Sequence, residues 1–445
     1  MKKSLVALAA LAVIGAASAQ SSVTMYGAVE PTVDFGYKNR TNTMTQTFTP
    51  TGALASTTMA STEYKPGFRV NDGNDQGTGT SRIGWLGTED LGGGLKAKFQ
   101  LEMGLRVDDG CVTNGSGNVC SSGASGGNLF GRNAWLGIQG GLGEVRLGRQ
   151  VLGSFGVQAK SWAGGSSNGL YEPGALVSPL MGGVRFSNAV KYLSPNMGGF
   201  QATVTLAAPE IAGNTNTSTT AAFAPGVIPV TATTNAKAKT GLDLALEYGN
   251  GPLYVGFGYN RGGNNSDSNN GVAGAGNSLV NAGARSKQYT LGAAFDFGVV
   301  KPFINHTRAR VDGSNVTTPG AGVATAGFTD GREKATTIGL RAPIGAATLI
   351  TSYGVSKTTA GSRTANGAVN TAVSNLDGKE KAAQIGVQYP LSKRTLLEAN
   401  IGRFKNDTTT RGSSFAAVTG ALTGTSVTTF NQKVSAVNFG IKHSF

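Results

Sequence analysis

The amino-acid sequence predicts an all-β protein, a 16-stranded antiparallel transmembrane β-barrel. Three observations support this fold class: an amino-terminal export signal, strands whose side chains alternate strictly between apolar and polar, and connections of two distinct lengths. The end of the chain illustrates the alternation. Because side chains point to opposite faces of a strand in turn, it has an apolar outer face, a polar inner face and an aromatic border residue, as an outer-membrane barrel requires. The outer face carries Val437, Phe439, Ile441, His443 and Phe445, and the inner face carries Asn438, Gly440, Lys442 and Ser444.

Residues 1–19 have the pattern of a secretory signal peptide. Met1, Lys2 and Lys3 precede an apolar run over residues 5–17, and small residues at 17–19 mark a cleavage site before Gln20. A membrane anchor is the alternative, but the run is shorter than the roughly 20 residues that a helix needs to cross hydrocarbon. We therefore expect a signal peptide over 1–19 and a single β-barrel domain over 20–445.

The composition excludes a helical membrane protein and does not fit an ordinary soluble one. Only 39% of the residues are hydrophobic, the mean hydropathy is -0.09, and no later apolar run is long enough to span a bilayer. The chain has 68 glycines and only 14% charged residues. Glycine weakens helices and suits tight turns and bent strands. Loss of Lys2 and Lys3 with the signal peptide would leave 36 basic and 24 acidic residues, a net charge of +12.

The connections between the predicted strands are either short or long. Seven short, turn-rich junctions and eight long stretches rich in Gly, Ser, Thr, Asn and Ala make fifteen connections, which join sixteen strands. An even number is expected for a bacterial barrel, and eight long loops would be unusual in a compact soluble domain. The short junctions lie near residues 90–94, 140–143, 194–199, 249–252, 297–299, 342–345 and 389–394. The long stretches lie near residues 38–79, 107–128, 151–183, 209–236, 261–284, 312–332, 358–377 and 408–430.

The alternation predicts which side chains line the barrel. In residues 95–106 every odd position is apolar and the even positions carry the charges, and residues 253–259 and 289–297 show the same phase. A Lys or Arg facing lipid at mid-bilayer costs about 2 to 4 kcal/mol, so we expect the charged series to face the lumen. A soluble β-sandwich would also alternate, but it does not explain the export signal or the strand count. Because a barrel of about 16 strands encloses an aqueous channel, the architecture predicts a pore.

Cys111 and Cys120 are the only cysteines, and they flank a polar, turn-rich stretch. Export to an oxidising compartment favours a disulfide between them. A zinc pair is the alternative, but the stretch offers no further Cys or His, and structural zinc usually takes four such ligands.

Several short motifs together resemble the general porins of β-proteobacteria. They lie at residues 20–27, 81–92, 131–137, 147–150 and 192–195 and at Phe445. The resemblance spans the predicted barrel domain and implies a homotrimer whose third loop, here 151–183, folds into the barrel and narrows it. It also implies that Phe445 is the carboxy-terminal aromatic residue by which the barrel-assembly machinery receives such chains.

The same resemblance implies that Arg82, Arg132 and Arg185 line the constriction opposite the third loop. The alternation agrees for two of them: Ile83 and Trp85 take the lipid-facing phase beside Arg82, and Trp135 takes it when Arg132 faces inward. The chain departs from relatives with an acidic third loop, because the loop's charged residues are only Lys160 and Glu172. Leu86 occupies an inward position where relatives often carry a basic residue.

Further charges are expected in the lumen. Rings of Arg and Lys make pores anion-selective, and a Debye length of about 8 Å at physiological salt lets such charges act across a narrow constriction. The alternative is that they are solvated residues with no selective role. We expect Glu172 to anchor the third loop on the wall arginines. His306 is expected in the lumen or close to a loop, and His443 is expected to face outward. The sequence does not determine which way Arg149 faces. The further lumenal charges are Lys96, Lys98, Arg106, Arg146, Glu30, Asp34, Glu102 and Glu144.

These features predict a pore in the outer membrane of a Gram-negative bacterium that passes small hydrophilic solutes by passive diffusion and prefers anions. The expected surroundings are lipid and lipopolysaccharide; no cofactor or metal is expected, and the dispersed positive charge does not suggest nucleic acid. One alternative is a channel specific for phosphate or an organic anion. A second is an outer-membrane hydrolase, which two histidines without a triad do not support. The third is an adhesin or antigen role of the long loops.

Overall fold

The structure is a computed structural model that describes residues 22–72, 81–113, 129–163, 183–208, 215–220, 231–236, 240–262, 285–312, 316–320, 323–366, 369–415 and 422–445. The predicted signal peptide lies outside these residues. The elements are β1 (Ser22–Val29), β2 (Pro31–Phe48), β3 (Leu54–Tyr64), β4 (Phe68–Asp72), β5 (Arg82–Gly92), β6 (Leu95–Leu105), β7 (Val112–Thr113), β8 (Asn133–Gly140), β9 (Gly143–Val151), α2 (Gly153–Lys160), β10 (Arg185–Leu193), β11 (Phe200–Ala207), β12 (Thr215–Thr220), β13 (Thr231–Ala236), β14 (Gly241–Asn250), β15 (Leu253–Gly262), β16 (Arg285–Phe295), β17 (Lys301–Asp312), β18 (Val316–Gly320), β19 (Val323–Ile344), β20 (Ala347–Asn366), β21 (Val369–Pro390), β22 (Thr395–Phe415) and β23 (Leu422–Ser444).

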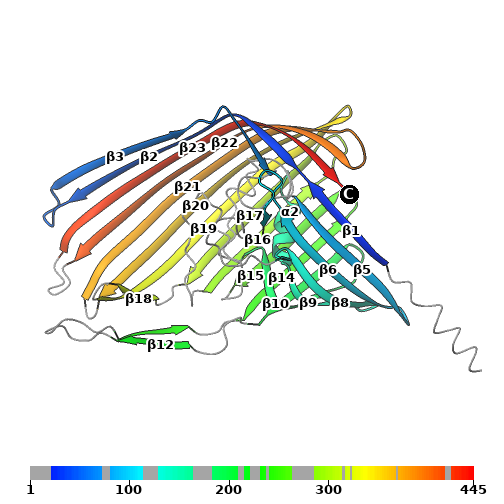
Figure 1. The fold of residues 1–445 in the computed structure, drawn as a ribbon, viewed down its shortest axis with the longest axis horizontal. Coiled ribbons are helices and arrows are strands. Elements are labelled where there is room, and N and C mark those ends of the chain that lie inside the picture. The colour runs from blue at the N-terminus through cyan, green and yellow to red at the C-terminus, as the bar shows by residue number, and fades with distance from the viewer. Residues whose placement is uncertain are drawn as a thin grey trace, which may run out of the picture.

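Consecutive strands pair antiparallel, and the last strand returns to the first, so the sheet closes into a barrel (Figure 1). β23 pairs with β22 on one side and with β1 and β2 on the other, where Ser444 lies opposite Ala28 and Gly440 opposite Thr32. β1 and β2 are two parts of the first barrel strand, and β3, β4 and β5 are parts of the second. The others are β6, β8 to β11, β14 to β17 and β19 to β23, which gives the sixteen strands that the sequence predicts.

All seven predicted short junctions connect adjacent strands. The turn between β5 and β6 shows why glycine is needed there, since Gly92, Gly93 and Gly94 have φ values of +80°, +61° and +80°, a region that other residues rarely adopt. The chain ends where the short turns lie, at the right of Figure 1. The long connections therefore lie at the opposite end.

Five of the predicted long loops contain paired strands instead of irregular structure, and one of them, near residues 209–236, holds the hairpin of β12 and β13. β19 to β23 have 20 to 23 residues each, which at about 3.3 Å per residue far exceeds an apolar band about 25 Å tall. The long stretches near residues 38–79, 209–236, 312–332, 358–377 and 408–430 are therefore not loops over their whole length. Threonine explains the difference, because it is β-branched and suits strands and pairs across them, as between the Oγ1 atoms of Thr45 and Thr428 at 3.2 Å.

The two faces of the barrel wall differ as predicted for a membrane barrel. Apolar side chains such as Leu291, Ile385 and Phe439 are exposed on the outside, whereas inward polar side chains such as Thr290 and Asn305 are buried. One expectation is wrong: Trp135 is only 6% exposed and shares the inner face with Asn133, while the next residue, Leu136, is 61% exposed on the outer face. None of the described helical residues forms a segment long and apolar enough to cross a membrane.

Candidate pore constriction

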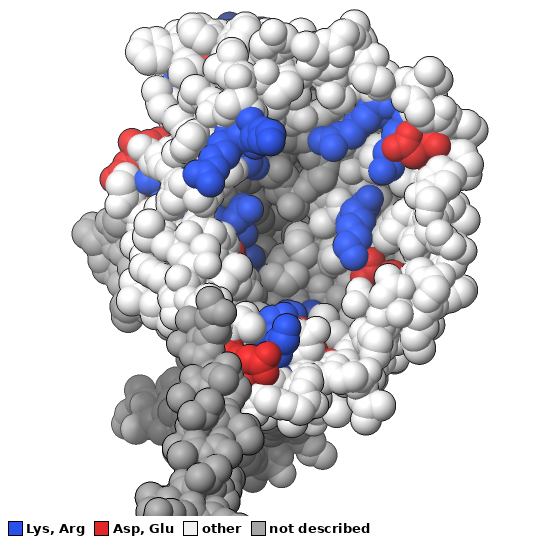
Figure 2. Space-filling view, turned by 90° about the vertical axis from the view of Figure 1, so that its right-hand side faces the viewer, with Lys and Arg blue, Asp and Glu red and all other residues white. Residues whose placement is uncertain are grey.

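The barrel is hollow, and basic side chains line the opening. Figure 2 views the molecule from the end that carries the short turns and shows Lys and Arg side chains around the cavity, with fewer Asp and Glu side chains beside them. The candidate constriction is formed by the charged inner face of the barrel and by the helix α2, which lies inside the barrel.

The described beginning of the predicted third loop, residues 151–163, folds into the barrel. Its helix α2 lies against the inner face of β11, β14, β15 and β16. Glycines on that wall make room for it: a Cβ atom at Gly258 would lie 2.8 Å from the Cα of Ser154, and one at Gly256 would lie 2.7 Å from a methyl carbon of the fully buried Val157. The absence of side chains at these wall positions thus allows the helix to approach the sheet closely.

Hydrogen bonds fix both ends of α2 to the wall. The buried carboxylate of Asp243 on β14 accepts the backbone N–H groups of Gly153 at 2.7 Å and Ser154 at 3.2 Å. The first N–H groups of a helix lack partners within the helix, and negative charge is favourable there. At the other end, the Asn305 Nδ2 group on β17 donates to the Ser161 hydroxyl at 2.7 Å. Asp243 was not predicted as a site residue, although its alternation with Leu242 and Leu244 places it on the inner face.

Arg82 and Arg132 meet on one carboxylate of the wall. Glu102 on β6 is buried and accepts Arg132 Nε at 2.7 Å and the Tyr26 hydroxyl at 2.7 Å, while Arg82 Nε lies 3.7 Å away. Arg132 precedes the first residue of β8, Asn133, so strand alternation does not fix its direction. Two guanidinium groups on one carboxylate leave one net positive charge.

A second basic cluster lies on the next strands. Glu144 on β9 accepts Arg146 Nε at 2.6 Å and Lys98 Nζ at 3.4 Å. The Arg146 guanidinium lies 4.0 Å from the centre of the Trp135 ring, which makes a cation–π contact. Lys191 on β10 lies directly opposite Arg146 and donates to the Val151 carbonyl at 2.9 Å.

The charges of these two clusters do not cancel. Arg82, Arg132, Lys98, Arg146 and Lys191 are five cations, and Glu102 and Glu144 are the two carboxylates that pair with them. Five minus two leaves three positive charges among these seven residues, which lie on or beside β5 to β10. We call this set of residues the basic wall.

Other predicted site residues lie outside the basic wall. Lys160 at the end of α2 binds Glu247 on β14 at 2.6 Å. Arg185 is buried at the start of β10, opposite Val151. Glu172 lies outside the described residues.

Lys96 and Arg106 lie at opposite ends of β6. Lys96 is exposed near the short-turn end, opposite Asp90. Arg106 follows the strand and forms ion pairs with Asp108 at 2.8 Å and Asp109 at 3.1 Å.

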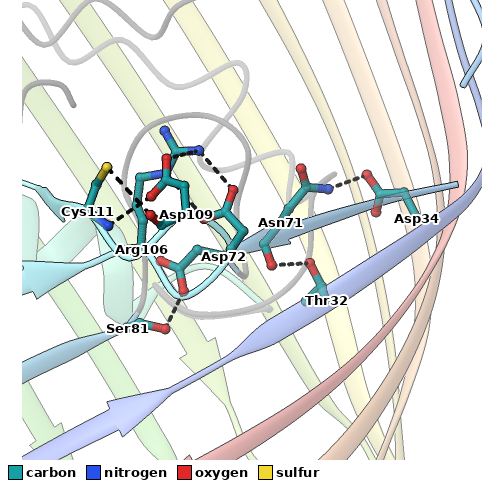
Figure 3. A network of polar contacts seen from close by, with 9 residues as sticks. Thr32, Asp34, Asn71, Asp72, Ser81, Arg106, Asp109 and Cys111 are labelled. Carbon is teal, nitrogen blue, oxygen red and sulfur yellow. Dashed lines mark hydrogen bonds and ion pairs between the residues drawn. The ribbon is translucent and has the colours of Figure 1, made fainter. Parts of the chain in front are cut away.

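Glu30 and Asp34 are neutralised on the wall where the barrel closes. Glu30 is buried and pairs with Lys442 at 2.9 Å. Asp34 accepts Arg69 Nε at 2.8 Å and the amides of Asn71 and Asn438 at 2.7 and 2.8 Å. Figure 3 shows the Asn71 contact and the neighbouring network toward Arg106 and Cys111.

The remaining candidates have these positions. Cys111 is buried, and its backbone N–H donates to Asp109 Oδ1 at 3.0 Å. Cys120 lies outside the described residues, so the disulfide stays a prediction.

His306 lies opposite Leu291 on the outer face and not in the lumen. Arg149 takes the outward phase, where it donates to the Gly131 carbonyl at 2.7 Å and the Ser187 hydroxyl at 2.6 Å.

Comparison with known proteins gives the family. The sequence profile described as Gram-negative porin matches residues 5–409. An outer membrane porin protein of Bordetella pertussis is 34% identical over 366 residues, which cover 78% of this chain and 82% of that protein. Outer membrane porin protein 32 of Delftia acidovorans is 37% identical over 211 residues, or 45% of this chain and 48% of that protein. The match to this relative and to major outer membrane protein P.IB of Neisseria lactamica thus spans about half of their length.

Solved structures show the same fold. The anion-selective porin from Comamonas acidovorans has a TM-score of 0.52 and 24% identity, with 96% of this chain and 100% of that chain covered. A loop L8 deletion mutant of OmpT, an outer membrane protein of Vibrio cholerae, has a TM-score of 0.53 and 14% identity, with 96% and 99% covered. The relatives named above are porins, not enzymes, and the resemblance found in the sequence motifs is confirmed. The chain belongs to the Gram-negative porin family and is a β-barrel of the outer membrane.

Proposed function

We propose that this porin is a passive pore for small hydrophilic solutes that prefers anions. The observation that carries the proposal is the basic wall, whose five cations outnumber their paired carboxylates by three. α2 lies inside the barrel against the adjoining strands β11 and β14 to β16, and Asp243 fixes it there. A passage lined by excess positive charge attracts anions and repels cations.

The pore needs no chemical step in this proposal. The third loop sets the width of the passage, and the fixed positive charges set the electrostatic potential along it. Arg82, Arg132 and Arg185 were expected to line the constriction, and Lys98 and Arg146 were expected among the further lumenal charges. The geometry supports Arg82, Arg132, Lys98 and Arg146 and adds Lys191, which was not expected. Arg185 stays a candidate at the extracellular side of the wall.

Bilayer recording tests the proposal and separates it from a substrate-specific channel. The protein is inserted into a planar bilayer, and current is measured in KCl with increasing phosphate. A general pore shows current that rises in proportion to salt and no block at low phosphate concentration. Saturation or block by a dilute anion would instead indicate a specific binding site, and a stronger passage of potassium than of chloride would refute the anion preference.

Assembly is a further part of the proposal. The backbone N–H and carbonyl of Phe445 pair with the carbonyl and N–H of Gly27 at 3.1 and 3.0 Å, so the terminal residue takes part in closing the barrel. Its ring covers Gly27, where a Cβ atom would lie 2.4 Å from a ring carbon. We propose that Phe445 presents the chain to the barrel-assembly machinery, that residues 1–19 are removed, that Cys111 and Cys120 form a disulfide, and that three copies associate. Chemical cross-linking of the purified protein tests the trimer.

A further inference from the structure

A buried tryptophan lies on the inner face of the barrel, where polar side chains are expected. Trp135 on β8 is only 6% exposed and lies opposite Gln100 on β6 and Gly148 on β9. Contact with lipid explains apolar side chains on the outer face of the wall, but it does not explain this one. The pore proposed above uses the charges of the basic wall and assigns no role to Trp135.

The side chain of Arg146 crosses from β9 to the Trp135 ring on β8. Arg146 lies directly opposite Gly137, and Trp135 lies two residues before Gly137 on the same strand. Such diagonal neighbours are within reach of long side chains. Glycine at position 137 leaves room for the crossing, because a Cβ atom there would lie 3.0 Å from Arg146 Cγ. The guanidinium carbon of Arg146 lies 4.0 Å from the centre of the Trp135 ring.

Hydrogen bonds fix the polar edge of the Trp135 ring. The indole Nε1 group donates to Gln100 Oε1 at 3.0 Å, and Gln100 Nε2 donates to the Tyr26 hydroxyl at 2.6 Å. The Tyr26 hydroxyl in turn donates to Glu102 Oε2 at 2.7 Å. The amide of Gln100 thus accepts with its oxygen and donates with its nitrogen, as its chemistry requires. The ring is therefore tied to the Glu102 carboxylate and does not turn freely in the lumen.

The guanidinium of Arg146 has one hydrogen-bond acceptor and one aromatic contact. Its Nε group donates to Glu144 Oε1 at 2.6 Å, and its face lies on the Trp135 ring. Among the residues that the structure describes, its two terminal amino groups donate to no acceptor. Lys191 lies directly opposite Arg146 on β10, and like charges opposite each other are unfavourable. The aromatic contact therefore offsets a repulsion and leaves the terminal amino groups of Arg146 available to the passage.

We propose that Trp135 is a positioning residue for anion selectivity, which holds the Arg146 guanidinium open to the passage. Arg146 is then a selectivity-determining residue of the basic wall, and Trp135 acts through it. Tryptophan suits this role because its ring attracts a cation more strongly than the rings of Tyr and Phe do. The alternative is that Trp135 only fills space, in which case another apolar side chain would serve equally well. The inference rests on the proposed function and adds the residue that orients one of its charges.

A double-mutant cycle on the purified full-length protein tests the proposal. The zero-current potential in a KCl gradient across a planar bilayer gives the chloride-to-potassium permeability ratio of the wild type, Trp135→Leu, Arg146→Gln and the double variant. A cation–π contact of ordinary strength favours the stacked arrangement about fivefold. Trp135→Leu is therefore expected to lose part of the chloride preference, and Arg146→Gln, which removes the charge, is expected to lose more. The double variant is expected to match Arg146→Gln, because the effect of Trp135 passes through Arg146.

Two further variants separate positioning from space filling. Trp135→Phe keeps an aromatic face and is expected to retain more of the chloride preference than Trp135→Leu. Trp85→Leu is the matched control: Trp85 lies opposite Leu101 on the outer face of the wall and contacts the Phe130 ring, so its replacement is expected to leave the permeability ratio unchanged. If Trp135→Leu does not fold, Gln100→Leu takes its place in the cycle, because it removes the acceptor that fixes the ring.

Three results overturn the proposal. These are a Trp135→Leu variant with the permeability ratio of the wild type, an equal loss of chloride preference from Trp135→Leu with and without Arg146, and a Trp135→Phe variant that loses as much as Trp135→Leu. The proposed function fails in a different way, through a wild type that prefers potassium. The role of Trp135 is read from the differences between the variants, so the same cycle supports or overturns it whichever ion the wild type prefers.

Discussion

The close contact between α2 and Gly258 predicts that one added methyl group changes the pore. In Gly258→Ala the new Cβ would lie 2.8 Å from both the Cα and the Cβ of Ser154, whereas carbon atoms reach their optimal contact at about 3.5 to 4.0 Å. The helix and the wall must therefore separate by about 0.7 Å or more. The wall is the more rigid partner, because Gly258 is paired on both sides, with Ala245 on β14 and Thr290 on β16.

We therefore expect α2 to move away from β15 into the lumen and narrow the passage. Overpacking of this kind costs about 1 to 3 kcal/mol, which a closed barrel tolerates, so the variant is expected to fold and to show a lower single-channel conductance than the wild type. Gly361→Ala is the matched control, because the nearest atom to its added Cβ lies at 3.5 Å, an ordinary contact. Identical conductance in the wild type and the folded Gly258→Ala variant would refute the placement of α2 against this wall.

The other predictions concern the anchor and the charges. Asp243→Asn replaces the carboxylate that accepts the Gly153 and Ser154 N–H groups. Because hydrogen bonds to charged groups contribute about 1.5 to 3 kcal/mol, we expect α2 to move more and the open-channel current noise to rise. Unchanged noise would contradict an anchoring role. Glu102→Gln removes the carboxylate that Arg82 and Arg132 share, so the chloride preference should increase. Glu63→Gln, on the exposed hairpin of β2 and β3, is the control and should have no effect. A lower chloride preference in Glu102→Gln would contradict the role of these arginines in anion selectivity. Raising KCl from about 0.15 to about 1 M shortens the Debye length from about 8 to about 3 Å. The anion preference should therefore fall as the salt concentration rises. A preference independent of salt would exclude an origin in the fixed charges.

The sequence was sufficient to predict the barrel because membrane burial imposes a strict rule on each strand. The alternation in residues 95–106 identifies the inner face of β6, and the paired lengths of the connections give the strand count. Loops rich in Thr were harder to predict, because the composition that marks a solvated loop also favours an exposed β-hairpin. The pairing of Thr45 with Thr428 depends on strands far apart in the chain.

The site was only partly predictable, for a related reason. Alternation places Glu102 in the lumen but does not show that Arg82 and Arg132 share it, since this requires the register between strands. Alternation also gave the wrong facing for Trp135. Arg132 lies just before β8, so the direction of its side chain does not show which residues of β8 face inward. The seat of α2 depends on Gly256 and Gly258, whose role appears only when the helix lies against them.

The central claim is that the basic wall makes this porin prefer anions. The most direct test measures the zero-current potential of the wild type across a planar bilayer with a KCl gradient, beside a variant in which Arg82, Arg132, Lys98 and Arg146 are each replaced by Ser. We expect the wild type to give a potential of the sign set by chloride, and the variant to give a smaller or reversed potential. A wild-type potential of the sign set by potassium, or an unchanged potential in the folded variant, would contradict the claim.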